Sequence, residues 1–182
     1  MNWFRLVVNM AIQNIAVLGA GQMGNGITQV AAAAGYNVTM IDIEQAYVDN
    51  GLATIERSLG KLVSKERMTQ EDADATLARI SLSTDRADCA DCDLVVEAVP
   101  EIVDLKTSIF AELDSICKPE TILASNTSSI SISTIADATN RPDKVIGMHF
   151  MNPVPIMKLV EVINGNKTSS ETNAAVIEAS EK

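Results

Sequence analysis

The chain has 182 residues, of which 47% are hydrophobic and only 3% aromatic, and its formal net charge is −10 at pH 7. This length and composition predict one domain with an aliphatic core, and the acidic balance excludes nucleic acid as an expected partner because phosphate backbones are repelled. No run approaches the roughly 18 apolar residues that a membrane-spanning helix requires, so no membrane partner is expected.

Three cysteines, Cys89, Cys92 and Cys117, show no disulfide-dense pattern. Their odd number favours a reducing compartment, which we take to be the cytoplasm. The stretch "CADC" has a spacing found in zinc and redox sites, but one further cysteine and a distant histidine are poor material for four ligands. We therefore expect plain thiols and no metal.

Residues 1–10 are interpreted as an N-terminal extension of unknown role. They are mildly apolar, but Arg5 and Asn9 interrupt them and no small-residue cleavage site follows, so they do not resemble a signal peptide. Met10 is an alternative start of the chain.

Beyond this extension, predicted strands and helices alternate. Each strand is a short apolar run bounded by turn residues, and each helix keeps apolar residues at helical spacing. In chain order the sequence predicts a strand over residues 12–18, a helix over 22–34, a strand over 37–42, helices over 44–65 and 69–78, strands over 79–83 and 93–99, a helix over 103–117, a strand over 121–125, a short helix over 131–138, strands over 144–150 and 157–163, and a final helix over 169–182. This rhythm predicts that residues 11–182 form an α/β domain with a doubly wound, mostly parallel sheet of Rossmann type and helices on both faces.

The first predicted strand, turn and helix read "IAVLGAGQMGNG", with glycines at positions 19, 21 and 24. Gly19 permits a tight turn, Gly21 lets a pyrophosphate approach the backbone, and Gly24 lets the helix pack closely on the strand. The free N–H groups at the helix start favour the phosphates. A tight turn without a ligand is the alternative for the motif taken alone.

Asp42 ends the second predicted strand, which is where a carboxylate can bind the ribose diol of a dinucleotide. The same charge repels the extra phosphate of NADP, so the expected cofactor is NAD. The alternative for Asp42 is a helix cap before "IEQA".

Arg57, Lys61 and Lys65 recur every four residues on the next predicted helix, with Ser58 beside them. At this spacing they share one face. They form either a solvated face paired with Glu56 and Glu66 or an electrostatic landing site for a phosphorylated substrate.

Polar residues also follow or occupy three later strands, and ligands of open α/β sheets lie beyond the carboxyl ends of strands. The run "SNTSS" covers residues 125–129, His149 is the only histidine, and Glu161 lies in the last strand. Together they offer a base, an acid that orients it, and donors to a developing oxyanion. The alternatives are a structural histidine, an edge acid that faces water, and a helix cap.

The motifs "VLGAGQMGNGI", "LVVEAVPE", "ASNTSS" and "GMHFMNPVPIMKLVEVI", in this order, resemble the NAD-binding domain of 3-hydroxyacyl-CoA dehydrogenases from about residue 12 to the end. The resemblance implies hydride transfer between NAD and C3 of a short 3-hydroxyacyl-CoA, such as 3-hydroxybutyryl-CoA, in fatty acid or butyrate metabolism. By the same resemblance, His149 is the catalytic base, Glu161 orients it, and Ser128 binds the substrate oxygen.

The resemblance also implies ligand contacts. Asp42 then binds the adenosine ribose, and Glu101, Lys106 and Asn126 match positions around the cofactor. The positions of Ser58 and Lys65 match contacts to coenzyme A, which favours the functional interpretation of the basic helix face.

The family has a helical second domain, which supplies a further catalytic Asn, much of the acyl pocket and the homodimer contact, and this sequence ends at Lys182. We expect the isolated chain to bind NAD and to turn over acetoacetyl-CoA poorly or not at all. Two other functions stay open at this point: a dehydrogenase of free 3-hydroxy acids, and a non-catalytic NAD-binding relative.

Overall fold

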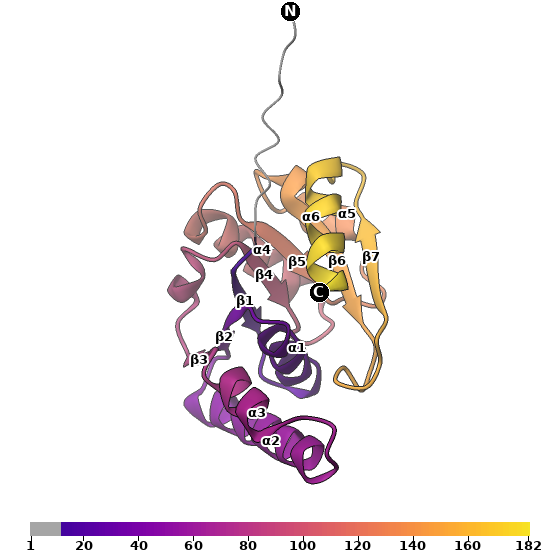
Figure 1. Cartoon of the computed structure of the whole chain (residues 1–182). Coiled ribbons are helices and arrows are strands. Elements are labelled where there is room, and N and C mark those ends of the chain that lie inside the picture. Colours follow the sequence, from indigo (N-terminus) through magenta and orange to yellow (C-terminus); the bar gives the residue numbers. More distant parts are fainter. Residues whose placement is uncertain (1–11) are drawn as a thin grey trace, which may run out of the picture.

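The computed structural model describes residues 12–182, so the predicted N-terminal extension lies outside the described part. The middle layer is a seven-stranded sheet with the strand order β3-β2-β1-β4-β5-β6-β7 (Figure 1). The strands are β1 (Asn14–Leu18), β2 (Asn37–Ile41), β3 (Ile80–Ser83), β4 (Leu94–Glu97), β5 (Ile122–Ser125), β6 (Val145–Phe150) and β7 (Val160–Asn164). The α-helices are α1 (Gln22–Ala33), α2 (Gln45–Ser64), α3 (Gln70–Leu77), α4 (Val103–Ile116), α5 (Ile132–Ala136) and α6 (Ser170–Glu181).

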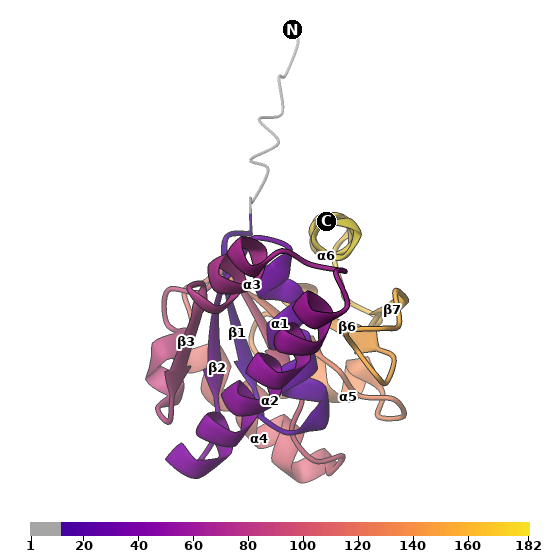
Figure 2. The ribbon, with the colours of Figure 1, turned by 60° about the horizontal axis from the view of Figure 1, so that its bottom comes forward.

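Helices cover both faces of the sheet, because successive strand side chains point to opposite sides. Ile15 and Val17 of β1 belong to the core cluster that includes residues of α1 and α6. Ala16 and Leu18 belong to the cluster formed with α4 and α5. A smaller cluster around Met40 joins β2 to α2 and α3, which lie beside α1 (Figure 2). The predicted doubly wound α/β fold is therefore confirmed.

The last strand departs from the parallel pattern. Strands β1 to β6 pair in parallel, whereas β7 runs antiparallel to β6 and places Glu161 opposite His149. The predicted strand over residues 157–163 therefore starts too early: the chain reverses after Phe150, and residues 151–159 make the connection. Because β7 runs backwards, its beginning lies at the edge where the parallel strands end.

Local chemistry accounts for several helix boundaries. Gly35 has a φ of +96°, a conformation that favours glycine, and it follows the end of α1. The hydroxyls of Thr69 and Ser169 accept backbone N–H groups at the starts of α3 and α6. Two short 3-10 segments, η1 (Arg86–Cys89) and η2 (Pro142–Lys144), were not predicted.

Among the described helices, none combines the length and the apolar character needed to cross a bilayer.

Candidate functional site

The glycine loop follows β1 at the point where the strand order reverses, since β1 lies between β2 and β4. In sheets of this kind the ligand crevice opens there. Gly19 has a φ of +99°, and a Cβ on it would lie 2.7 Å from the carbonyl oxygen of Ala98. A Cβ on Gly24 would lie 1.6 Å from the carbonyl oxygen of Gly19. Both positions therefore exclude a side chain.

Open space faces the start of α1. Gly21 is its N-cap residue. Outside its own helix and chain neighbours, no heavy atom lies within 4 Å of the place that a Cβ on Gly21 would take. Free N–H groups at this helix start, with no side chain in front of them, are the arrangement that a pyrophosphate requires.

Asp42 is tied to this loop rather than to the following helix. Its Oδ2 accepts the N–H of Ala20 at 2.7 Å and its Oδ1 accepts the N–H of Ile43 at 2.7 Å. The N-cap of α2 is Glu44, so the alternative of a helix cap does not describe Asp42. Each carboxylate oxygen keeps a further lone pair for a ligand hydroxyl.

A cavity of about 670 Å³ opens beside the glycine loop and Asp42. Its other walls are mostly apolar and include Ile43, Leu105 and Ile109. Clefts of this size, apolar with a few convergent polar groups, are typical of cofactor sites. The residues present therefore fit the adenosine and pyrophosphate of a dinucleotide.

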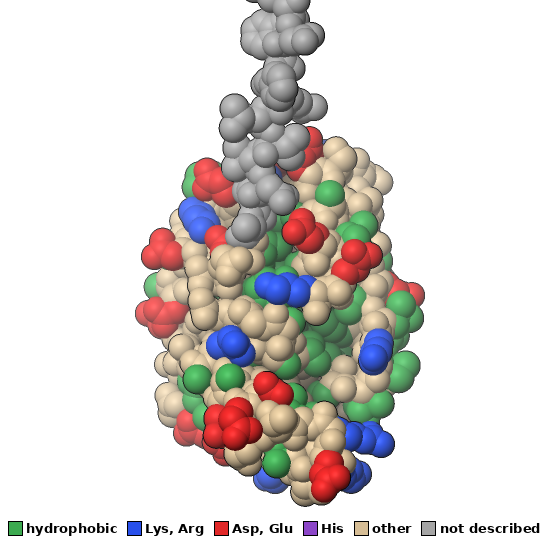
Figure 3. Space-filling view, viewed as in Figure 1, with side chains coloured by type: hydrophobic (Ala, Val, Ile, Leu, Met, Phe, Trp, Pro, Cys, Tyr) green, Lys and Arg blue, Asp and Glu red, His purple; other side chains and the backbone are tan. Residues whose placement is uncertain are grey.

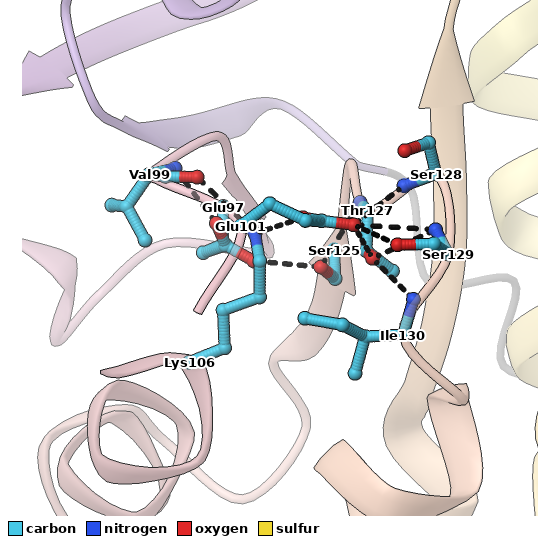
Figure 4. A network of polar contacts seen from close by, with 9 residues as sticks. All are labelled: Glu97, Val99, Glu101, Lys106, Ser125, Thr127, Ser128, Ser129 and Ile130. Atoms are coloured by element: carbon cyan, nitrogen blue, oxygen red, sulfur yellow. Dashed lines mark hydrogen bonds and ion pairs between the residues drawn. The ribbon is translucent and has the colours of Figure 1, made fainter. Parts of the chain in front are cut away.

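A buried ion pair lies where β4 ends (Figure 4). The side chains of Glu97 and Lys106 are 0% and 1% exposed, and Lys106 Nζ lies 2.6 Å from Glu97 Oε1. The same ammonium donates to the carbonyl oxygen of Val99 at 3.2 Å and lies 3.2 Å from Glu101 Oε2. The second oxygen of Glu97 accepts the Ser125 hydroxyl at 2.6 Å. All three ammonium hydrogens are thus used within the protein.

Glu101 accepts several hydrogen bonds from the loop that follows β5. Its Oε1 accepts the Thr127 hydroxyl and the backbone N–H groups of Ser128 and Ser129, the latter two at 3.1 and 3.2 Å (Figure 4). Burial alone raises the pKa of Glu101, but hydrogen bonds from Thr127, Lys106 and Ser129 and the charge of Lys106 outweigh it and lower the pKa to about 2. Glu101 is therefore a permanent anion at neutral pH.

The same loop is fixed on its other side by Asn126. Its Oδ1 accepts the N–H of Phe150 at 2.8 Å, and its N–H donates to the carbonyl oxygen of Glu97 at 2.8 Å. Asn126 therefore joins the ends of β4 and β6. Ser128 is exposed, and its hydroxyl stays outside the network of Figure 4.

His149 and Glu161 meet across the β6–β7 ladder. The distance from His149 Nδ1 to Glu161 Oε2 is 2.8 Å, and the two side chains are 20% and 51% exposed. A carboxylate acceptor places the imidazole hydrogen on Nδ1, which leaves the lone pair on Nε2. The geometry is thus that of an oriented base at the sheet edge, and a histidine sealed in aliphatic packing is not what the structure shows.

The basic residues of α2 remain exposed. Arg57, Lys61 and Lys65 are exposed and Ser58 is half-buried. The only hydrogen bond from these three cations is that of Arg57 to the Thr54 hydroxyl, at 3.0 Å, and none pairs with a described carboxylate. Ion pairs with Glu56 or Glu66 are therefore not seen in residues 12–182, and the exposed face is compatible with either a solvated surface or a landing site for a phosphorylated substrate.

The three cysteines are buried free thiols. They belong to the core cluster beneath α4 and α5. Burial is the largest cause that raises the pKa of Cys92 and of Cys117 to about 11. Among the described residues, no group of metal-ligating side chains comes together.

The sequence-based site omitted Glu97, which is the centre of the buried network. The signal was present, because an acid inside the apolar run "LVVEAV" must be paired if it is buried. Thr127, whose hydroxyl binds Glu101 and accepts from the N–H of Ile130, was treated only as part of a hydroxyl cluster.

Residues 14–182 match a family model described as 3-hydroxyacyl-CoA dehydrogenase, NAD binding domain. A probable 3-hydroxybutyryl-CoA dehydrogenase of Deinococcus radiodurans is 54% identical over 166 residues, which are 91% of this chain and 59% of that protein. A probable 3-hydroxybutyryl-CoA dehydrogenase of Bacillus subtilis is 49% identical over 95% of this chain and 60% of its own length.

Solved structures agree with these sequence matches. The crystal structure of (S)-3-hydroxybutyryl-CoA dehydrogenase from Ralstonia eutropha superposes with a TM-score of 0.92 at 48% identity, over 94% of this chain and 60% of that chain. This chain thus spans about 60% of the length of these relatives. It belongs to the 3-hydroxyacyl-CoA dehydrogenase family, of which it carries the NAD-binding domain.

Proposed function

We propose that this chain is the cofactor-binding part of an enzyme that moves a hydride between NAD and C3 of a short 3-hydroxyacyl-CoA, such as 3-hydroxybutyryl-CoA. The observation that carries the proposal is the 2.8 Å contact between His149 and Glu161 at the sheet edge that also holds the glycine loop. The names of the relatives from Deinococcus radiodurans and Bacillus subtilis support the substrate class.

In the oxidative direction, Nε2 of His149 takes the proton of the 3-hydroxyl group. Glu161 stabilises the resulting imidazolium through the hydrogen on Nδ1. The Ser128 hydroxyl donates to the same substrate oxygen and so stabilises the charge that develops there. NAD, when bound, supplies the hydride acceptor. In the reductive direction His149 begins protonated and gives its proton to that oxygen.

The cofactor is held by the carboxyl ends of β1, β2, β4 and β5. The glycine loop (residues 19–24) binds the pyrophosphate, and Asp42 accepts the hydroxyls of the adenosine ribose. Asn126 and Glu101 lie at the nicotinamide end. Lys106 stays a predicted cofactor residue, and its burial favours an indirect part: it holds Glu101 in place rather than reaching the ligand.

The exposed face of α2 receives coenzyme A. Ser58 and Lys65 are the proposed contacts, and the unpaired cations beside them attract a phosphorylated substrate to an otherwise acidic protein. In a protein of the relatives' full length, the remaining part completes the acyl pocket and forms the homodimer contact. We place the enzyme in the cytoplasm.

The test is His149→Gln in a protein of full family length. Turnover should fall on the order of 10²- to 10⁴-fold, as expected for a general acid–base group, while the affinity for NAD stays within about twofold. Lys167→Gln is the matched control, because its exposed ion pair with Asp137 takes no part in the site. A His149→Gln enzyme with wild-type turnover would refute the assignment, and a preference for free 3-hydroxybutyrate over its thioester would refute the substrate class.

A further inference from the structure

An ion pair closes the far side of the proposed adenosine site. Arg86 begins η1, just after β3, and its Nη1 donates to Glu112 Oε2 on α4. The side chains of Arg86 and Glu112 are 31% and 43% exposed, so both remain accessible to a ligand.

This pair lies beside Asp42. A second cavity, of about 300 Å³, adjoins the first and is lined by both members of the pair. The two cavities share Gly19, Asp42, Ile43, Val99 and Arg86 as lining residues. This inference rests on the proposed placement of NAD, in which Asp42 binds the adenosine ribose. The adenine ring then lies next to that ribose, against Ile43 and Val99.

These apolar neighbours can cover the faces of an adenine ring, but they leave its polar edge without partners. The 6-amino group is a donor and the ring nitrogen beside it is an acceptor. Glu112 is an acceptor, and the guanidinium of Arg86 keeps further N–H donors after it has bonded Glu112. Two other carboxylates line the smaller cavity: Asp42 is assigned to the ribose, and Asp85 caps η1 through its Oδ1, which accepts the N–H of Ala87 at 2.8 Å. Arg86 is the only basic residue that lines either cavity in the described part of the chain.

We propose that the Arg86–Glu112 pair recognises the adenine of NAD through its polar edge. Glu112 accepts the 6-amino group and Arg86 donates to the neighbouring ring nitrogen. The ion pair holds both side chains in position before the cofactor arrives, so that little side-chain entropy is lost on binding.

The proposal predicts discrimination between NAD and nicotinamide hypoxanthine dinucleotide. In hypoxanthine an oxo group replaces the 6-amino group and the adjacent ring nitrogen carries a hydrogen. Glu112 then faces an acceptor and Arg86 faces a donor. Because unpaired polar groups at a site are costly, the wild-type chain should bind NAD about tenfold more tightly than the hypoxanthine analogue.

Isothermal titration calorimetry of the 182-residue chain with each dinucleotide is the test. In Glu112→Gln the amide can accept from an amino group or donate to an oxo group, so the preference should shrink to about twofold or less. Arg86→Ala should lower NAD affinity about tenfold, since it removes the donor. Asp137→Asn, which breaks the distant exposed pair with Lys167, should leave both affinities unchanged.

Equal binding of the two dinucleotides by the wild-type chain would overturn the proposal. The proposal would also be wrong if Glu112→Gln kept the wild-type ratio of the two affinities, because the ion pair would then only hold η1 against α4. Failure of the cofactor placement is distinguishable: in that case the wild-type chain would bind neither dinucleotide.

Discussion

Replacing Lys106 by methionine should destabilise the domain by leaving a buried carboxylate without its counter-charge. Glu97 is 0% exposed and would lose a contact of 2.6 Å, while keeping the N–H of Val99 at 2.7 Å and the Ser125 hydroxyl at 2.6 Å. Removal of one partner from a buried ion pair costs about 3–5 kcal/mol. Because Glu97 keeps two hydrogen bonds, the expected loss of stability for Lys106→Met is about 3 kcal/mol.

The assay is urea unfolding at pH 7, followed by far-ultraviolet circular dichroism. The double variant Lys106→Met/Glu97→Gln should lose only about 1–2 kcal/mol, because no buried charge is left unpaired. Lys118→Met is the matched control: its pair with Asp93 is 37% and 24% exposed, so the loss should stay below about 1 kcal/mol.

Two outcomes would refute this reasoning. In one, the free energy of unfolding of Lys106→Met lies within about 1 kcal/mol of the wild-type value, which would mean that the ion pair contributes little to stability. In the other, the Glu97→Gln loss adds fully to that of Lys106→Met, which would mean that the two side chains are not coupled.

Acid unfolding should depend on Glu101, whose pKa of about 2 lies below that of an ordinary glutamate. Its contribution to stability is present above about pH 4.5 and is lost as the pH falls towards 2. The free energy of unfolding of Glu101→Gln should therefore change less with pH across that range than that of the wild-type chain. The choice between NAD and NADP should depend on Asp42. Asp42→Asn should weaken NAD binding about tenfold, since a charged acceptor for the ribose diol is lost. The difference between the affinities for NAD and NADP should also become smaller, since the charge that repels the extra phosphate of NADP is removed. Calorimetric titration with both cofactors checks this, and a wild-type chain that binds NADPH as tightly as NADH would contradict the role of Asp42.

The tertiary arrangement brings hydrophobic side chains from separate strands together in a hollow on one face of the molecule. In Figure 3, charged side chains of both signs lie over the helices, while hydrophobic side chains gather in the hollow between α1 and α6. Ile15, Val96, Met148 and Phe150 line this apolar cavity, which is about 670 Å³. These residues come from three separate strands, β1, β4 and β6, so local spacing alone does not predict that they share one surface.

The sequence by itself determined the alternation of strands and helices, the glycine loop and the candidate base. Most of these features are local: apolar periodicity, turn residues and the close approach of Gly24 to Gly19 act over a few neighbouring positions. The contact that excludes a side chain at Gly19 comes from Ala98, which is distant in the sequence. The direction of β7 was not available from periodicity, because parallel and antiparallel strands show the same alternation of side chains.

Only the tertiary structure decided which charges meet. Lys106 was predicted as a cofactor contact, yet its ammonium is held between Glu97 and Glu101. Arg86 and Glu112, 26 positions apart, come together because η1 packs against α4. Such pairings depend on which elements the sheet order makes neighbours, and that order follows from packing of the whole core rather than from any single stretch of sequence.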